Sequence, residues 1–119
     1  MGEEKLSLAE IQHRLREFNK ARDWGQYHSP RNLAMALNVE ASELLELYLW
    51  SADGGPQPPV STRESQVEKE AADVGICLLN FCERSGIDLL GAIQAKLDSN
   101  EERYPVELAK GRLEKSDEL

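Results

Sequence analysis

The sequence predicts an all-α protein built as a four-helix bundle. Apolar residues recur with the period of an α-helix along most of the chain, and no segment alternates apolar and polar residues as a half-buried strand does. Helix caps, a proline at a first helical position and a glycine stop separate the helical segments. No internal repeat is present, so the 119 residues are expected to form one domain, residues 1–119, with a core of about residues 7–108 and a polar tail at 109–119.

The first two helices are recognised by their N-terminal caps. Residues 7–10 have a Ser-x-x-Glu capping-box pattern, which predicts a helix that extends to about Arg22. The Ser-Pro pair at residues 29–30 combines an N-cap with proline at the first helical position. It predicts a second helix that continues to Trp50 or Ser51.

The third and fourth helices follow a linker rich in glycine and proline at residues 52–59. Residues 61–64 have a further capping-box pattern, so the third helix should begin there, extend to about Arg84 and end at the Ser-Gly pair that follows. The fourth helix should begin near Asp88. It should break before Pro105, because proline disfavours the helical conformation of the preceding residue.

The second helix is apolar around most of its circumference between Leu33 and Leu49. Such a helix is buried on more than one side. A chain of this size is too small to bury that surface alone, so we expect a homo-oligomer, a dimer or a tetramer.

The formal net charge of −8 argues against a surface for DNA or RNA. No apolar segment reaches the length of about 18 residues that a membrane helix needs, and the acidic N-terminus has no apolar core of a secretion signal. Cys77 and Cys82 are five residues apart in a predicted helix, which is poor geometry for a disulfide. We therefore expect reduced cysteines and a cytoplasmic protein without a nucleic-acid or membrane partner.

Four acidic residues stand where a bundle helix is usually apolar: Glu40 and Glu43 in the second helix, Glu70 and Asp73 in the third. The i, i+3 spacing puts both carboxylates of each pair on one helix face, within about 60° of leucine and valine positions. The linker allows the two helices to fold back antiparallel, so the pairs should face each other. Their repulsion and lost hydration favour a bound hard cation, Mg²⁺ or in its place Mn²⁺.

Other interpretations of the acidic pairs stay open at this point. Helix glutamates are usually solvated, although the flanking leucines argue against full exposure. A di-iron bundle normally has Glu-x-x-His pairs, and neither His13 nor His28 stands in one. The chain has no GxxxxGK[ST] loop, which excludes a P-loop NTPase.

Two further groups of residues suit a nucleotide. Lys96, Asn100 and Arg103 share one face of the fourth helix and could hold phosphate oxygens, with Tyr104 next to them and Arg84 in reach. The alternative is a solvated charged face. Aromatic and imidazole side chains in the loop before the second helix and at its end could stack on a base, or could simply pack; these are Trp24, Tyr27, His28 and Trp50.

Taken together, ExxE…ExxD, the DWxxxHxPRNL stretch within Arg22–Trp50, and KxxxNxxRYP resemble the all-α nucleoside triphosphate pyrophosphohydrolases of the MazG-like superfamily. The chain looks most similar to the dCTP pyrophosphatase subgroup, over roughly residues 8–105. This resemblance implies Mg²⁺-dependent hydrolysis of a (deoxy)nucleoside triphosphate to the monophosphate and pyrophosphate, with dCTP or related pyrimidine deoxynucleotides favoured. It also implies assembly as a homodimer or as a dimer of dimers, which is a homotetramer.

The resemblance implies roles for individual residues. The metal ligands would be Glu40, Glu43, Glu70 and Asp73, and Glu40 or Glu43 could also position the attacking water as general base. The nucleotide contacts would come from Trp24, His28, Trp50, Arg84, Lys96, Asn100, Arg103 and Tyr104. Cys77 stands where the subgroup has a tyrosine near the nucleotide, and Leu15 where it has a histidine, so base selectivity should be weaker. The rival hypothesis is a non-catalytic oligomeric protein that binds nucleotides or serves as a scaffold.

Overall fold

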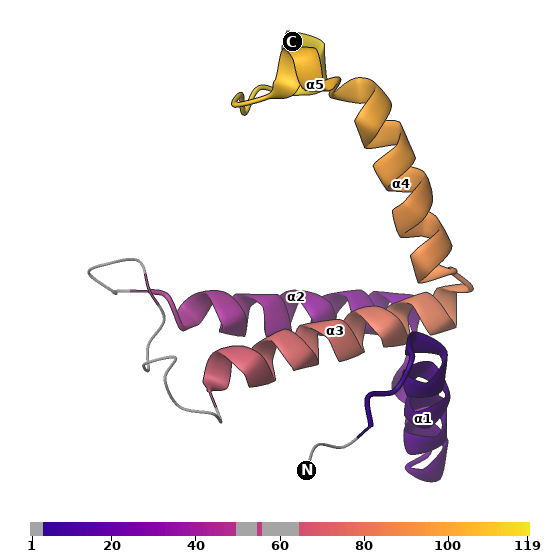
Figure 1. Cartoon of the computed structure of the whole chain (residues 1–119). Helices are drawn as coiled ribbons and strands as arrows, with labels where there is room; N and C mark the ends of the chain where they lie inside the picture. The colour runs from indigo at the N-terminus through magenta and orange to yellow at the C-terminus, as the bar shows by residue number, and fades with distance from the viewer. Residues whose placement is uncertain (1–3, 50–54, 56–64) are drawn as a thin grey trace. The chain divides into compact units, whose positions relative to one another are not determined.

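The computed structural model describes residues 4–49, 55 and 65–119. The regular secondary structure of these residues is helical, with no strand among them, which confirms the all-α prediction. The elements in order are α1 (Leu8–Ala21), the 3₁₀ helix η1 (Trp24–Tyr27), α2 (Pro30–Glu46), α3 (Gln66–Ser85), α4 (Leu89–Arg103), α5 (Val106–Ala109) and the 3₁₀ helix η2 (Ser116–Glu118) (Figure 1).

The chain divides into two compact units, residues 1–86 and 87–119. In the first unit, α2 and α3 lie side by side and run in opposite directions (Figure 1). The side chains of α1 reach the C-terminal half of α3, where Asn19 donates a hydrogen bond to Asn80. The second unit consists of α4, α5 and η2. The joining of both units into one bundle, and into a single domain 1–119, stays a prediction.

Local capping sequences form the bonds expected of them. The Ser7 hydroxyl accepts a hydrogen bond from the Glu10 amide at 3.1 Å, and the Glu10 carboxylate accepts one from the Ser7 amide at 2.9 Å. The Ser29 hydroxyl likewise accepts from the Asn32 amide at 3.1 Å. Gly86 ends α3 with φ 69°, a left-handed conformation that glycine adopts without steric cost.

The helix ends differ from the sequence prediction in three places. The amides of Leu47 and Tyr48 donate to carbonyls three residues earlier, so α2 tightens into a turn after Glu46 instead of continuing to residue 50 or 51. Trp50, Ser51 and the capping pattern at 61–64 lie outside the described residues. The N-cap of α3 is Ser65, whose hydroxyl accepts from the Val67 amide at 3.1 Å. The short α5 after Pro105 was not expected.

The described residues bury very little apolar surface. Only Leu33 and Cys82 are buried hydrophobic residues, with 4% and 3% of their surfaces exposed. Large apolar side chains remain exposed on every long helix, among them Ile11, Met35, Val39, Leu45, Ile76, Leu90 and Leu97. Both cysteines are free thiols. No helix among the described residues combines the length and hydrophobicity required to cross a membrane.

Candidate active site

Three carboxylates from two helices converge in the first unit. Glu40 and Glu43 come from α2 and Glu70 comes from α3, and one oxygen of each lies within 4.8 Å of the others. The convergence follows from the sequence, because the i, i+3 spacing aligns the two α2 acids and antiparallel packing brings Glu70 opposite them. All three are half-buried. They are called the carboxylate cluster below.

Asp73 lies next to the carboxylate cluster but is not part of it. Its side chain is exposed, and its carboxylate does not fall within the 4.8 Å group. Its negative charge still contributes to raising the pKa values of Glu40, Glu70 and Cys77. The structure therefore brings three of the four predicted metal ligands together and leaves the fourth at their edge.

The unfavourable electrostatics of the cluster raise the pKa values of Glu40 and Glu70. Burial, followed by the charge of Glu43, raises the pKa of Glu40 to about 7. Burial and then the same charge also raise the pKa of Glu70. One buried oxygen of each, Glu40 Oε2 and Glu70 Oε2, has no hydrogen-bond partner. An ionised buried oxygen without a partner is costly, so the cluster requires either bound protons or a cation.

The donor set suits a hard divalent cation. It offers only carboxylate oxygens from Glu40, Glu43 and Glu70, the ligand type that Mg²⁺ and Mn²⁺ prefer. A cation among them would satisfy the two unpartnered oxygens and remove the repulsion between the acids. The acidic residues thus fit a metal site on their geometry and electrostatics.

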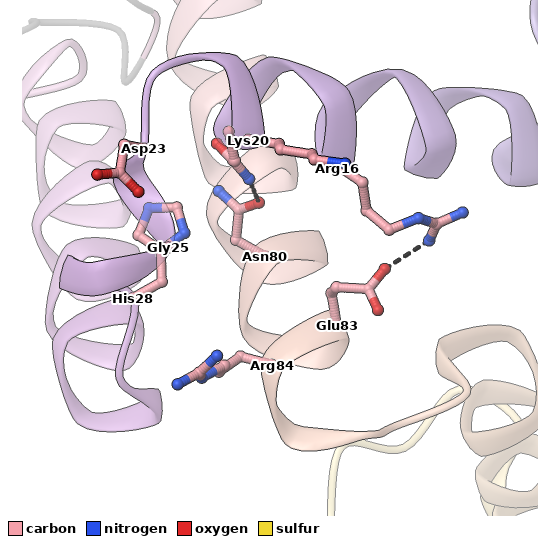
Figure 2. A pocket seen from close by; sticks show the side chains of 9 residues that line it. Arg16, Lys20, Asp23, Gly25, His28, Asn80, Glu83 and Arg84 are labelled. Atoms are coloured by element: carbon pink, nitrogen blue, oxygen red, sulfur yellow. Dashed lines mark hydrogen bonds and ion pairs between the residues drawn. The ribbon is translucent and has the colours of Figure 1, made fainter.

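A second feature is a cavity of about 510 Å³ beside the C-terminal half of α3 (Figure 2). Its lining residues come from α1, the loop with η1, and α3: Arg16, Asn19, Lys20, Asp23, Gly25, His28, Asn80, Glu83 and Arg84. We call it the α1–α3 cavity. Two bonds tie α1 to α3 across it, the Arg16–Glu83 ion pair and the hydrogen bond from Asn19 Nδ2 to Asn80 Oδ1 at 3.0 Å.

The α1–α3 cavity contains two of the residues expected to contact nucleotide, His28 and Arg84. In Figure 2 their imidazole and guanidinium groups extend into the same open space. Trp24 does not line this cavity; its ring packs edge-on against Phe18, with centroids 5.5 Å apart. Cys77 is half-buried on α3, and burial followed by the charges of the nearby acids raises the pKa of its thiol.

A sequence model of the MazG-like family matches residues 35–119. The chain belongs to the MazG-like family. It is 42% identical over 115 residues to dCTP pyrophosphatase 1 of Homo sapiens, covering 95% of this chain and 68% of that protein. It is 40% identical over 107 residues to the Rattus norvegicus dCTP pyrophosphatase 1, covering 88% of this chain and 63% of the relative's length.

A solved structure shares this fold. A pyrophosphatase from Archaeoglobus fulgidus matches the MazG-like chain with a TM-score of 0.73 and 35% sequence identity. The match covers 88% of this chain and 98% of the archaeal chain. The residues that form the carboxylate cluster lie within the matched family segment, residues 35–119.

The remaining expected phosphate contacts of the MazG-like chain lie in the second unit. Lys96 and Arg103 are exposed on α4, and Asn100 and Tyr104 are half-buried. Arg103 Nε donates to the Ser116 hydroxyl at 3.2 Å, and its guanidinium lies 5.7 Å from the Tyr104 ring centre. Their approach to the carboxylate cluster stays a prediction, as does any role of Trp50, which lies outside the described residues.

Sequence reasoning missed the Asn19–Asn80 pair. A signal for Asn80 was available, because Asp73, Cys77, Asn80 and Arg84 follow an i, i+4, i+7, i+11 pattern that places them on one face of a helix. No comparable signal pointed to Asn19, since its partner is 61 positions away in the chain.

Proposed function

We propose that the chain is a metal-dependent nucleoside triphosphate pyrophosphohydrolase that converts a (deoxy)nucleoside triphosphate and water to the monophosphate and pyrophosphate. The carboxylate cluster carries this proposal, because its two buried unpartnered oxygens leave a place for a cation. The names of the curated relatives, dCTP pyrophosphatase 1, support the reaction class. Mg²⁺ is the proposed cofactor and Mn²⁺ its substitute.

In this mechanism Glu40, Glu43 and Glu70 hold the cation, with Asp73 beside them. The bound ion would neutralise the triphosphate and lower the pKa of a coordinated water. Glu40 is one candidate to position the attacking water and accept its proton. Glu43 is the second candidate for this role. The new P–O bond forms as the α–β bridging bond breaks, and the electron pair leaves on pyrophosphate.

The nucleotide would lie with its phosphates at the carboxylate cluster. Arg84 lines the α1–α3 cavity as a candidate nucleotide contact. On α4, Lys96 and Arg103 are the cations proposed to stabilise the leaving pyrophosphate. We propose dCTP or a related pyrimidine deoxynucleotide as the preferred substrate, with Cys77 giving the base more room than a tyrosine would. Two free thiols, which are typical of a reducing compartment, support a cytoplasmic location as part of this proposal.

A nucleotide panel tests the proposed function. With Mg²⁺, the full chain is expected to hydrolyse dCTP, dTTP, dATP and dGTP with unequal kcat/KM values, highest for a pyrimidine. Chelation of the metal by EDTA should stop the reaction. Anion-exchange chromatography would quantify each monophosphate. Absence of turnover with every triphosphate in the presence of Mg²⁺ or Mn²⁺ would contradict the proposal.

We also propose a homo-oligomer, a dimer or tetramer, because the chain alone leaves large apolar side chains in water. Met35 and Val39, spaced i, i+4 on α2, are 57% and 54% exposed. The Met35→Asp/Val39→Asp variant is expected to dissociate to monomers and to melt at a lower temperature than the wild type. Light scattering after size exclusion measures the mass. Asn38→Asp adds an acid to the same helix at an exposed polar position and should leave the mass unchanged.

The wild-type chain is expected to form a dimer or a tetramer in solution. Light scattering at micromolar concentration should give two or four times the mass of one chain. A stable and active wild-type monomer under those conditions would contradict it.

A further inference from the structure

The Asn19–Asn80 pair has no part in the hydrolysis described above, yet both residues line the α1–α3 cavity, in which Figure 2 labels Asn80. Asn19 Nδ2 donates to Asn80 Oδ1 at 3.0 Å, and both residues are half-buried. An asparagine side chain has one carbonyl acceptor and one amino group with two donors. Because Asn19 engages the carbonyl of Asn80, the amino group of Asn80 is left for a ligand.

Arg84 lies one turn further along α3 and adds donors to that of Asn80, because a guanidinium group can only donate. The two acids of the cavity each bind a neighbour through one oxygen: Glu83 Oε1 pairs with Arg16, and Asp23 Oδ2 accepts a hydrogen bond from Gln26 at 3.2 Å. A ligand therefore meets donors at Asn80 and Arg84, and the edge that it turns toward these two residues fits best if it presents acceptors.

The position of Asn80 relates the cavity to the carboxylate cluster. Asp73 and Asn80 lie on one face of α3, seven residues or about 10 Å apart along the helix axis. Cys77 lies between them on the same face. A nucleotide carries its phosphates and its base at opposite ends. With the phosphates at the carboxylates, the base end extends along α3 toward Asn80, and a cavity of about 510 Å³ has the size of a small-molecule site.

We propose that Asn80 is a specificity-determining residue that donates to a nucleobase edge with two adjacent acceptors, and that Asn19 is the positioning residue that orients it. Cytosine presents this edge at O2 and N3, and guanine presents it at O6 and N7. Thymine and uracil carry a hydrogen on N3, which would face the Asn80 amino group and leave donors unpaired. The inference rests on the proposed function for the location of the phosphates.

The test exchanges the donor at position 80 for an acceptor. In Asn80→Asp the carboxylate still accepts from Asn19, so the fold is expected to persist, but it can only accept from the base. Calorimetry with α,β-imido triphosphates of cytosine, guanine, thymine and adenine measures binding without hydrolysis. In the wild type, the cytosine or guanine analogue should bind at least about tenfold more tightly than the thymine analogue, the effect of one unpaired donor.

Asn80→Asp should lower that ratio at least about tenfold, and Asn19→Ala should lower it to a smaller extent. The added negative charge weakens the binding of every triphosphate to a similar extent. The ratio of two affinities measured on the same variant is therefore not affected by it. Asn38→Asp makes the same chemical change at an exposed site on α2 and should leave the ratio at its wild-type value. Melting temperatures of all variants identify any loss of fold.

The binding ratios test the role of Asn80, and hydrolysis tests the proposed function independently. An unchanged ratio in Asn80→Asp, with wild-type hydrolysis intact, would overturn the role of Asn80 alone. Base discrimination that depends on Asn80 in a chain that hydrolyses no triphosphate would support the inference and contradict the proposed reaction. A wild type that binds the thymine analogue as tightly as the others would overturn the inference.

Discussion

Glu40→Gln is expected to lower Mg²⁺-dependent kcat/KM for dCTP by about a hundredfold or more, because loss of even an outer-shell partner of a metal site costs about 10–100-fold. It should also raise the melting temperature of the metal-free protein. Both effects have one cause, because the neutral amide replaces a half-buried carboxylate that Glu43 repels and that is favourable only when a cation is bound. Steady-state kinetics and calorimetric melting in EDTA measure the two effects.

Glu68→Gln is the matched control for this prediction. Glu68 is an exposed acid in the first turn of α3 and lies outside the carboxylate cluster. Its substitution should leave kcat/KM unchanged and should lower the melting temperature slightly, opposite to Glu40→Gln, because an acid at a helix N-terminus is stabilising. The rival hypothesis, a non-catalytic scaffold, predicts the rise in stability for Glu40→Gln without any Mg²⁺-dependent activity in the wild type. Wild-type rates in Glu40→Gln would show that the cluster is not the site of hydrolysis.

The metal-free protein is expected to lose stability as the pH rises from about 5 to about 8. The folded-state pKa of Glu40 is about 7 against an ordinary value of 4.5, and that of Glu70 is raised as well. At pH values between these two pKa values, Glu40 is protonated in the folded chain and ionised in the unfolded chain. The stabilisation is therefore complete below the ordinary pKa and is lost as the pH passes through the folded value.

Mg²⁺ should reverse this trend, since it binds the ionised carboxylates and competes with protons. The rise in melting temperature on addition of Mg²⁺ is expected to be larger at pH 8 than at pH 5.5. Differential scanning calorimetry at both values, with EDTA or with Mg²⁺, gives the comparison. In Glu40→Gln the pH dependence should be weaker. A metal-free melting temperature that rises from pH 5.5 to pH 8 would contradict the shifted pKa values.

The sequence predicted correctly those helix ends that depend only on neighbouring residues in the chain. The capping box at Ser7 and Glu10 and the left-handed Gly86 depend only on neighbours in the chain, so they could be recognised from the sequence. The end of α2 could not. Its apolar pattern continues to residue 49 while the backbone tightens after Glu46, because a helix-forming side-chain pattern does not determine whether the last turn is α or 3₁₀.

The candidate site was predictable to the extent that it depends on one helix face. The i, i+3 acids showed which carboxylates would share a face, but the exclusion of Asp73 from the 4.8 Å group depends on how α2 and α3 are rotated against each other. The Asn19–Asn80 hydrogen bond joins two helices that are distant in sequence. Such a contact has no periodic signature, so the α1–α3 cavity could only be found in three dimensions.

Phosphorus NMR of a dCTP reaction tests the proposed hydrolysis most directly. With wild-type protein and Mg²⁺, the three triphosphate resonances should be replaced by one monophosphate and one pyrophosphate resonance in equal molar amounts, and EDTA should prevent the change. Cleavage between the α- and β-phosphates gives no other primary products. Primary formation of dCDP with orthophosphate, or the same reaction in the presence of EDTA, would contradict a metal-dependent pyrophosphohydrolase at the carboxylate cluster.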